Sequence, residues 1–470
     1  MREKTEKSIL IGNGININFG GKAYTNDYII KRIRFNARAN KYDLLFDNKI
    51  KGDDIASIFV ELATWTNEIY GGKFDAIIPS EEKPILEDFK ARYNWKLTHY
   101  YEVGLEDWLF ILHVYFLQHA DIADNWSSAK QGFERVILDA IYNDGDIQKL
   151  YKFMGKPVKR WLLEFNNVFT LNYDNNVEEL INRPVFHLHG DFRTLANSEN
   201  PQTVMGYIRE SKGEKVDIPP NFEHCFCNAL LDYSGEHKYE IANEFEKSTE
   251  WLQFLERSDI PSKSCSPLIE ELMRVHKEHP ELAFGNNYHF TEFRDLTGEL
   301  CIIGMSPNND SHIFKLINES KVERVVFFYF SDRESKKELP IHQKVEYASA
   351  QDLWRRLDAS PKQYNCHYSI PKKDEVRDFW KVFNLMSDDK VAETDIIKSA
   401  NSIPQFEARR LCDIVTEKLK AQQAQGTPRN EQEQLYQFRE ISRIALRNGI
   451  LPSALYLHVI MGMNANKRRA

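Results

Sequence analysis

Polar side chains that could do chemistry follow three short apolar runs of this chain. They are Gly12-Asn13-Gly14 near the start, Thr170-Leu171-Asn172-Tyr173-Asp174, and His187-Leu188-His189-Gly190. In an open α/β sheet, groups that follow neighbouring strands meet in one crevice, and such folds bind their ligands there. We therefore expect an amide, a carboxylate and an imidazole to share one pocket with a glycine turn.

Each of these polar groups suits a different chemical task. The neutral carboxamide of Asn172 can orient a water molecule and hydrogen-bond a hydroxyl group, and Asp174 can hold an amide or a hydroxyl group. His189 titrates near neutral pH, which makes it the candidate general base. His187 lies on the same side of the strand as His189, because alternate residues share a face, so it stays the alternative base. Helix caps and a hydrogen-bonded core histidine are the structural alternatives for these residues.

The glycines suit an anion. Without side chains at Gly12 and Gly14, backbone N–H groups can approach a phosphate, although two glycines after an apolar run also form ordinary tight turns. Asn16 follows closely, and another apolar run ends in Gly304-Met305-Ser306.

The order of these motifs resembles the sirtuin family, which carries Gly-Ala-Gly, Thr-Gln-Asn-x-Asp, His-Gly and Gly-x-Ser in that order. The resemblance is local and lies between about residues 8 and 330. It implies that NAD is the substrate and that Asn172, His189 and Asp174 form the catalytic site. It also implies that the dinucleotide contacts Gly12, Asn13, Gly14, Asn16, Thr170, Gly304 and Ser306.

Departures from the sirtuin pattern change the expected reaction. Asn13 stands where sirtuins have Ala, Leu171 replaces Gln, and Asn18-Phe19-Gly20-Gly21 stands in place of Pro-Asp-Phe-Arg. The Gly-Asn-Gly opening is more similar to the abortive-infection H family of phage resistance. The resemblance thus implies a bacterial antiphage effector that hydrolyses NAD+ to ADP-ribose and nicotinamide. An NAD-dependent protein deacylase and a non-catalytic NAD or ADP-ribose sensor are the alternatives.

The cysteines argue against a zinc ribbon. Cys225 and Cys227 are separated by one residue, and the next cysteine is Cys265. Structural zinc sites pair their ligands about two to four residues apart, twice over. We expect no metal, and His224 beside Cys225 leaves a three-ligand site as the alternative.

Composition limits the class of partner. The chain has 470 residues, 42% of them hydrophobic, and a net charge of −8, which gives no broad electrostatic reason to bind nucleic acid. Met1 to Lys7 are charged rather than apolar, and the longest apolar run, Trp108 to Leu117, is too short to cross a bilayer. We expect a cytoplasmic protein that binds neither membrane nor nucleic acid.

The elements that must position these residues suggest an α/β fold with a Rossmann-like parallel sheet. Two insertions, about 22–165 and 200–300, interrupt it. Apolar spacing predicts helices at 104–119, 133–141, 240–255 and 267–276, a short strand at 203–206, and strands at 300–304 and 324–330 on either side of a helix at 312–320.

Beyond about residue 372 the pattern is helical only. Phe406, Leu411 and Val415 belong to one apolar stripe, and Leu435 and Ile441 belong to a second. We therefore expect a sirtuin-like domain at 1–372 and an all-α domain at 373–470. This second domain is expected to mediate regulation or assembly, through a homo-oligomer or a partner protein from the same defence operon.

Overall fold

The structure is a computed structural model. It describes residues 6–46, 48–93, 97, 99–214, 217–231, 238–239, 242–243, 267–307, 310–331, 338–359, 392–424 and 431–467. The chain forms two compact units. One contains Met1–Phe19 and Asn36–Ser360, and the other contains Gly20–Phe35 and Pro361–Ala470. The predicted boundary near residue 372 lies outside the described residues.

The described part of the first unit contains a sheet of six parallel strands in the order β3-β2-β1-β4-β5-β6. The strands are β1 (Lys7–Ile11), β2 (Asn167–Thr170), β3 (Phe186–His187), β4 (Thr297–Ile303), β5 (Lys321–Tyr329) and β6 (Lys344–Ser349). This is the strand order of doubly wound dinucleotide-binding folds, and it reverses direction between β1 and β4. The predicted Rossmann-like α/β class is confirmed.

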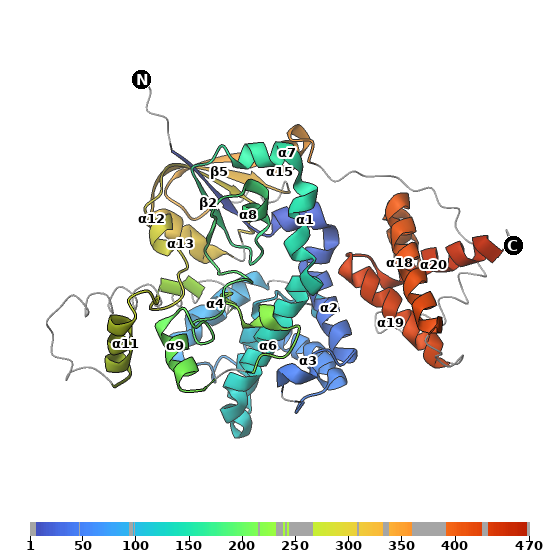
Figure 1. The fold of residues 1–470 in the computed structure, drawn as a ribbon, viewed down its shortest axis with the longest axis horizontal. Helices are drawn as coiled ribbons and strands as arrows, with labels where there is room; N and C mark the ends of the chain where they lie inside the picture. The colour runs from blue at the N-terminus through green and yellow to red at the C-terminus, as the bar shows by residue number, and fades with distance from the viewer. Residues whose placement is uncertain are drawn as a thin grey trace. The chain divides into compact units, whose positions relative to one another are not determined.

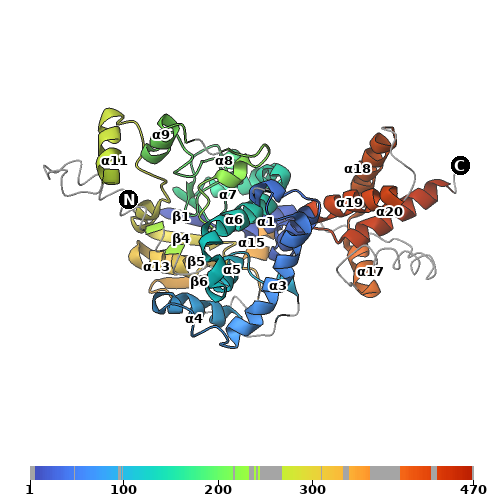
Figure 2. The same ribbon diagram turned by 90° about the horizontal axis from the view of Figure 1, so that it is seen from below.

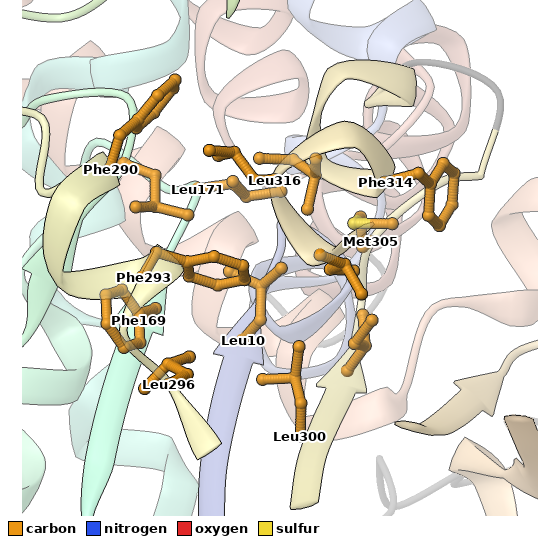
Figure 3. Close-up of a cluster of buried hydrophobic side chains, with 14 of the residues drawn as sticks. Leu10, Phe169, Leu171, Phe290, Phe293, Leu296, Leu300, Met305, Phe314 and Leu316 are labelled. Carbon is orange, nitrogen blue, oxygen red and sulfur yellow. The ribbon is translucent and has the colours of Figure 1, made fainter. Parts of the chain in front are cut away.

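Helices lie on both faces of the sheet, as Figures 1 and 2 show. On one face, α12 (Phe290–Arg294) and α13 (Ser311–Glu319) pack on apolar residues of β1, β2 and β4 (Figure 3). Phe293 meets Phe169 edge to face there, with ring centroids 5.0 Å apart. On the other face, α7 (Tyr151–Leu162) and α15 (Ala350–Arg356) meet through two tryptophans. The ring centroids of Trp161 and Trp354 are 6.0 Å apart. Burial on both faces explains the apolar runs within these strands, at residues 9–11 of β1, 168–169 of β2 and 300–303 of β4.

The segment between β1 and β2 is helical. It comprises α1 (Gly14–Gly20), α2 (Asn26–Arg38), α3 (Gly52–Tyr70), α4 (Lys83–Arg92), α5 (Asp107–Gln118), α6 (Trp126–Tyr142) and α7, with short 3-10 turns between them. The helices predicted at 104–119 and 133–141 are confirmed by α5 and α6. Trp108, Leu109 and Ile111 of α5 are fully buried, as expected for a helix that is apolar nearly all round.

The segment between β3 and β4 contains α9 (Val204–Ser211), α11 (Pro267–Glu278) and α12. The strand predicted at 203–206 is wrong, because the Thr203 hydroxyl accepts from the Gly206 N–H at 3.2 Å and begins a helix. The helix predicted at 267–276 is confirmed by α11. Of the helix predicted at 240–255, only 242–243 lie within the described residues, and both are helical.

The strands and helix predicted at 300–330 are confirmed by β4, α13 and β5. Strand β6 was not predicted; its side chains are partly or fully exposed and include Lys344 and Glu346. A strand with so few apolar residues gives no apolar run to recognise.

The second unit contains α17 (Glu393–Ser402), α18 (Gln405–Ala424), α19 (Glu431–Arg447) and α20 (Pro452–Lys467). The two predicted amphipathic helices correspond to α18 and α19, whereas α17 and α20 were missed. Arg32 is buried in this unit and donates from Nη2 to the carbonyls of Ala23 at 2.6 Å and Leu446 at 3.3 Å. These bonds join Gly20–Phe35 to the C-terminal helices. Among the described helices of the chain, none has the length and apolarity needed to cross a membrane.

Candidate functional site

All the predicted site residues lie at the carboxyl ends of β1, β2, β3 and β4. Gly12, Asn13, Gly14 and Asn16 follow β1; Thr170, Asn172 and Asp174 end or follow β2; His187 and His189 end or follow β3; Gly304 and Ser306 follow β4. Because the four strands are parallel neighbours, these residues share one end of the sheet, beside the point where the strand order reverses.

The glycines form a close backbone junction between two turns. The N–H of Gly12 donates to the Ile303 carbonyl and that of Gly14 to the Gly304 carbonyl, both at 2.8 Å. A Cβ on Gly14 would lie 2.5 Å from the Gly304 Cα, and Gly304 itself has a φ of +74°. These amides, which were expected to approach a phosphate, are therefore already bonded, and the glycines serve first to let the two turns touch.

Asp174 is a clamp between the ends of β1 and β2. Its Oδ2 accepts from Asn16 Nδ2 at 2.6 Å, and its Oδ1 accepts from Asn176 Nδ2 at 2.6 Å and from the Asn176 N–H at 3.1 Å. Burial raises the pKa of Asp174, and these hydrogen bonds oppose the rise. Both carboxylate oxygens thus bind protein donors, which differs from the expected role of holding a ligand. In the part of the chain that the structure describes, Asn16 Oδ1 is buried and has no hydrogen-bond partner.

Asn172 lies over the turn that follows β1. Its N–H donates to Thr170 Oγ1 at 3.1 Å, and that hydroxyl donates to the Ile11 carbonyl at 3.1 Å. The Asn172 carboxamide is buried and approaches the Gly12 carbonyl at 3.4 Å. A contact of that length is weak, so the carboxamide can exchange it for a ligand at small cost.

His187 is held through both ring nitrogens. Nδ1 bonds the Asn172 carbonyl at 2.9 Å, and Nε2 pairs with Glu178 of α8 (Asn176–Ile181). Burial lowers the pKa of His187, but the pairing with Glu178 outweighs it and the net shift is upward. Both partners accept, so the ring donates from both nitrogens and lacks the lone pair that a base requires. This geometry favours His189 over His187 as the base.

His189 faces a second histidine, His312, which was not among the predicted site residues. Its Nε2 lies 2.8 Å from Nε2 of His312, on the first turn of α13, and both side chains are at most 3% exposed. Burial and the charge of Lys238 lower the pKa of both rings, whereas a hydrogen bond to the Leu171 backbone raises that of His189. The net shift of each ring is downward, so both imidazoles are neutral near pH 7.

Three charged groups adjoin the histidine pair. Lys238 is fully buried and pairs with Glu106, which holds the pKa of the lysine above its usual range. Burial, with Glu106, raises the pKa of Asp310 to about 7. His312 lies in the first turn of α13, the helix that follows β4, and not directly after a strand as the predicted residues do. Lys238 and Glu106 lie in no motif and could be found only from the structure.

In the described part of the chain, two groups of side chains have donor atoms within 4.8 Å of one another, as metal ligands do. They are Asp139 with His224 and Cys225, and His189 with Asp310 and His312. In the first, Lys41 donates to both Asp139 oxygens, at 2.9 and 2.7 Å, and burial holds the pKa of Cys225 well above its usual range. The Lys41 ammonium and a protonated Cys225 thiol do not suit a bound cation. The three-ligand metal site considered at His224 and Cys225 is therefore better described as an ion-pair network around Asp139.

In the second group, the His189 and His312 Nε2 atoms are 2.8 Å apart. Two ligands of a tetrahedral zinc ion stand about 3.3 Å apart, given metal–nitrogen bonds of roughly 2.0–2.1 Å. The shorter spacing and the neighbouring Lys238 charge fit a hydrogen bond better than a bound cation.

The chain was also compared with known proteins. Neither the models of protein families nor the curated proteins nor the solved structures give a match.

Proposed function

We propose that this protein is an NAD+ glycohydrolase, which cleaves the bond between nicotinamide and ribose. One observation carries the proposal: Asn172 and a neutral His189 stand at the ends of neighbouring strands, beside the reversal point of a sheet with dinucleotide-binding strand order. Asn13, Asn16, Thr170, Gly304 and Ser306 adjoin them and would contact the dinucleotide.

The reaction converts NAD+ and water to ADP-ribose, nicotinamide and a proton. The transition state carries positive charge on the ribose, so a neutral carboxamide such as Asn172 can orient the water without trapping a charged intermediate. A base must be unprotonated at working pH, and the low pKa of His189 meets that requirement. No metal or further cofactor is part of this proposal.

We further propose that the enzyme depletes NAD+ in the cytoplasm as a bacterial antiphage effector, in line with the resemblance to sirtuin-like defence proteins. Unregulated hydrolysis would kill the host, so a homo-oligomer or a partner protein would control it. Asn172 and His189 are buried, and control of substrate access to them is one place where such regulation would act. The isolated chain is therefore expected to turn over NAD+ slowly.

The test is nicotinamide release by the purified full chain, alone and with the products of neighbouring genes. Asn172→Ala and His189→Ala should each lower the rate about 100-fold or more, the range for loss of a general base. His342→Ala, at an exposed histidine, is the matched control and should keep the wild-type rate.

Three results would overturn the assignment. Absence of nicotinamide release under every condition would exclude hydrolysis. Formation of acetyl-ADP-ribose from acetylated peptides would assign a deacylase, and tight NAD+ binding without turnover would assign a sensor.

A further inference from the structure

The hydrogen bond between His189 and His312 limits where the protons of the two rings can lie. Two imidazole nitrogens at 2.8 Å form a hydrogen bond only if one carries the proton and the other offers its lone pair. His189 also bonds the backbone of Leu171, and this bond favours the protonated ring, as a bond from the ring to a carbonyl does. We therefore assign the proton of the neutral His189 to the ring nitrogen that faces Leu171, and with this assignment its Nε2 accepts from His312 Nε2–H.

This tautomer leaves one free lone pair, on the far nitrogen of His312. That atom, Nδ1, is buried and, as far as the described residues extend, accepts no hydrogen bond. An incoming proton can therefore bind at His312 Nδ1. The bond to the Leu171 backbone, however, stabilises the charged form of His189.

We propose that His189 and His312 form a two-histidine proton relay, in which His312 Nδ1 accepts the proton and His189 ends with the charge. This inference rests on the proposed NAD+ hydrolysis. The water oxygen bonds to the ribose C1′ while the C1′–nicotinamide bond breaks, and the electron pair of that bond neutralises the departing pyridinium ring. The proton of the water passes to His312 Nδ1, and the proton on His312 Nε2 moves to His189 Nε2. His312 is then neutral again, and His189 is an imidazolium until it returns the proton to solvent.

The charged groups around the two histidines favour the neutral form of both rings before the reaction. Lys238 acts on both rings and lowers the pKa of each. Glu106 pairs with Lys238, and Asp310 stands one residue before α13, with ligand-type atoms of Asp310, His189 and His312 all within 4.8 Å of one another. Burial raises the pKa of Asp310 to about 7, so this carboxyl group can ionise and offer a countercharge when a proton enters the relay.

His312→Gln separates a relay from a structural contact. The glutamine amide can still donate a hydrogen bond to His189 Nε2, but it cannot accept and pass on a proton. We expect kcat for nicotinamide release to fall about 100-fold with KM changed less than about threefold, since general-base catalysis contributes about that much. The acidic limb of the pH profile should also move to higher pH, because His312 lowers the pKa of His189. His342→Gln is the matched control and should leave kcat and the pH profile unchanged.

Nitrogen NMR of the histidine-labelled full chain gives a readout that does not need turnover. His189 should carry its proton on Nδ1 and His312 on Nε2. Wild-type kcat in His312→Gln, the opposite tautomers, or binding of zinc alone that is lost in His312→Gln would each overturn the relay. A wild-type chain that releases no nicotinamide would overturn the proposed function itself, and the two failures are therefore distinct.

Discussion

The polar residues at the carboxyl end of the sheet divide into two kinds. Asp174 and His187 are fully bonded within the protein, whereas Asn172 makes one weak side-chain contact and His312 Nδ1 has no hydrogen-bond partner among the described residues. The sequence predicted which residues gather there, because each follows a strand. It could not separate the two kinds, because the sequence does not show which of these side chains bond one another.

Asp174→Ala should lower the free energy of unfolding by about 3 kcal/mol. The change leaves the Asn16 and Asn176 donors buried and unpaired, and lost hydrogen bonds to a charged group cost about 1.5–3 kcal/mol. The measurement is urea unfolding followed by near-ultraviolet circular dichroism. Asp217→Ala, at an exposed position, should change the midpoint little. Equal urea midpoints for Asp174→Ala and Asp217→Ala would contradict the stabilising role of Asp174 between the ends of β1 and β2.

The histidine pair should make the protein less stable in acid. Both rings have folded-state pKa values below the usual 6.5, so their contribution is fully present above that value and is lost as pH falls toward the folded pKa. Between about pH 7 and about pH 5, the unfolding midpoint of His312→Gln should therefore fall less than that of the wild type. His342→Gln should follow the wild type. A wild-type slope in His312→Gln would show that His312 titrates normally.

At the scale of elements, the strand-then-glycine pattern predicted β1, its turn and the parallel sheet correctly. The errors were local. Thr203-Val204 has β-branched side chains that suggested a strand, but the Thr203 hydroxyl caps α9. The role of the glycines was also misjudged, because the contact between the turns after β1 and β4 joins residues nearly 300 positions apart.

Gly14→Ala should destabilise the first unit by about 3 kcal/mol, the upper part of the range for overpacking. The added Cβ would meet backbone atoms of Gly304, which cannot move aside as a side chain can. Gly285→Ala is the matched control, since its nearest neighbour would be 3.8 Å away. Thermal unfolding of both variants measures the difference. Similar losses of stability in Gly14→Ala and Gly285→Ala would mean that the backbone around Gly14 and Gly304 can move to accommodate the added Cβ.

At the scale of the whole molecule, the unit that holds the C-terminal helices is discontinuous in sequence. The change to an all-helical pattern predicted one division near residue 372, whereas Gly20–Phe35 also belongs to that unit. A change in composition along the chain can mark the point where one unit ends and the next begins. It cannot show that two separate segments belong to the same unit. Contacts such as that between Arg32 and Leu446 join distant segments and leave no such signal.

Truncation after Ala359 should expose the segment at residues 20–35 to solvent exchange. The segment would lose the Leu446 carbonyl that Arg32 bonds and the close contact of Ala23 with Gly449. Hydrogen exchange followed by mass spectrometry should show faster exchange in this segment and unchanged exchange in α3. Full protection of residues 20–35 in the shortened chain would rule out their dependence on the C-terminal helices.

Because the second unit is built from two segments that are far apart in the sequence, its parts are synthesised at different times. Residues 20–35 leave the ribosome early, but the carbonyl that Arg32 bonds is made only when Leu446 is added. At elongation rates of about 5–20 residues per second, the segment waits roughly 20–80 seconds for its partner. During that interval the nascent chain presents Tyr24, Ile29 and Ile33, which are buried in the finished protein, to the chaperones that meet it at the tunnel exit.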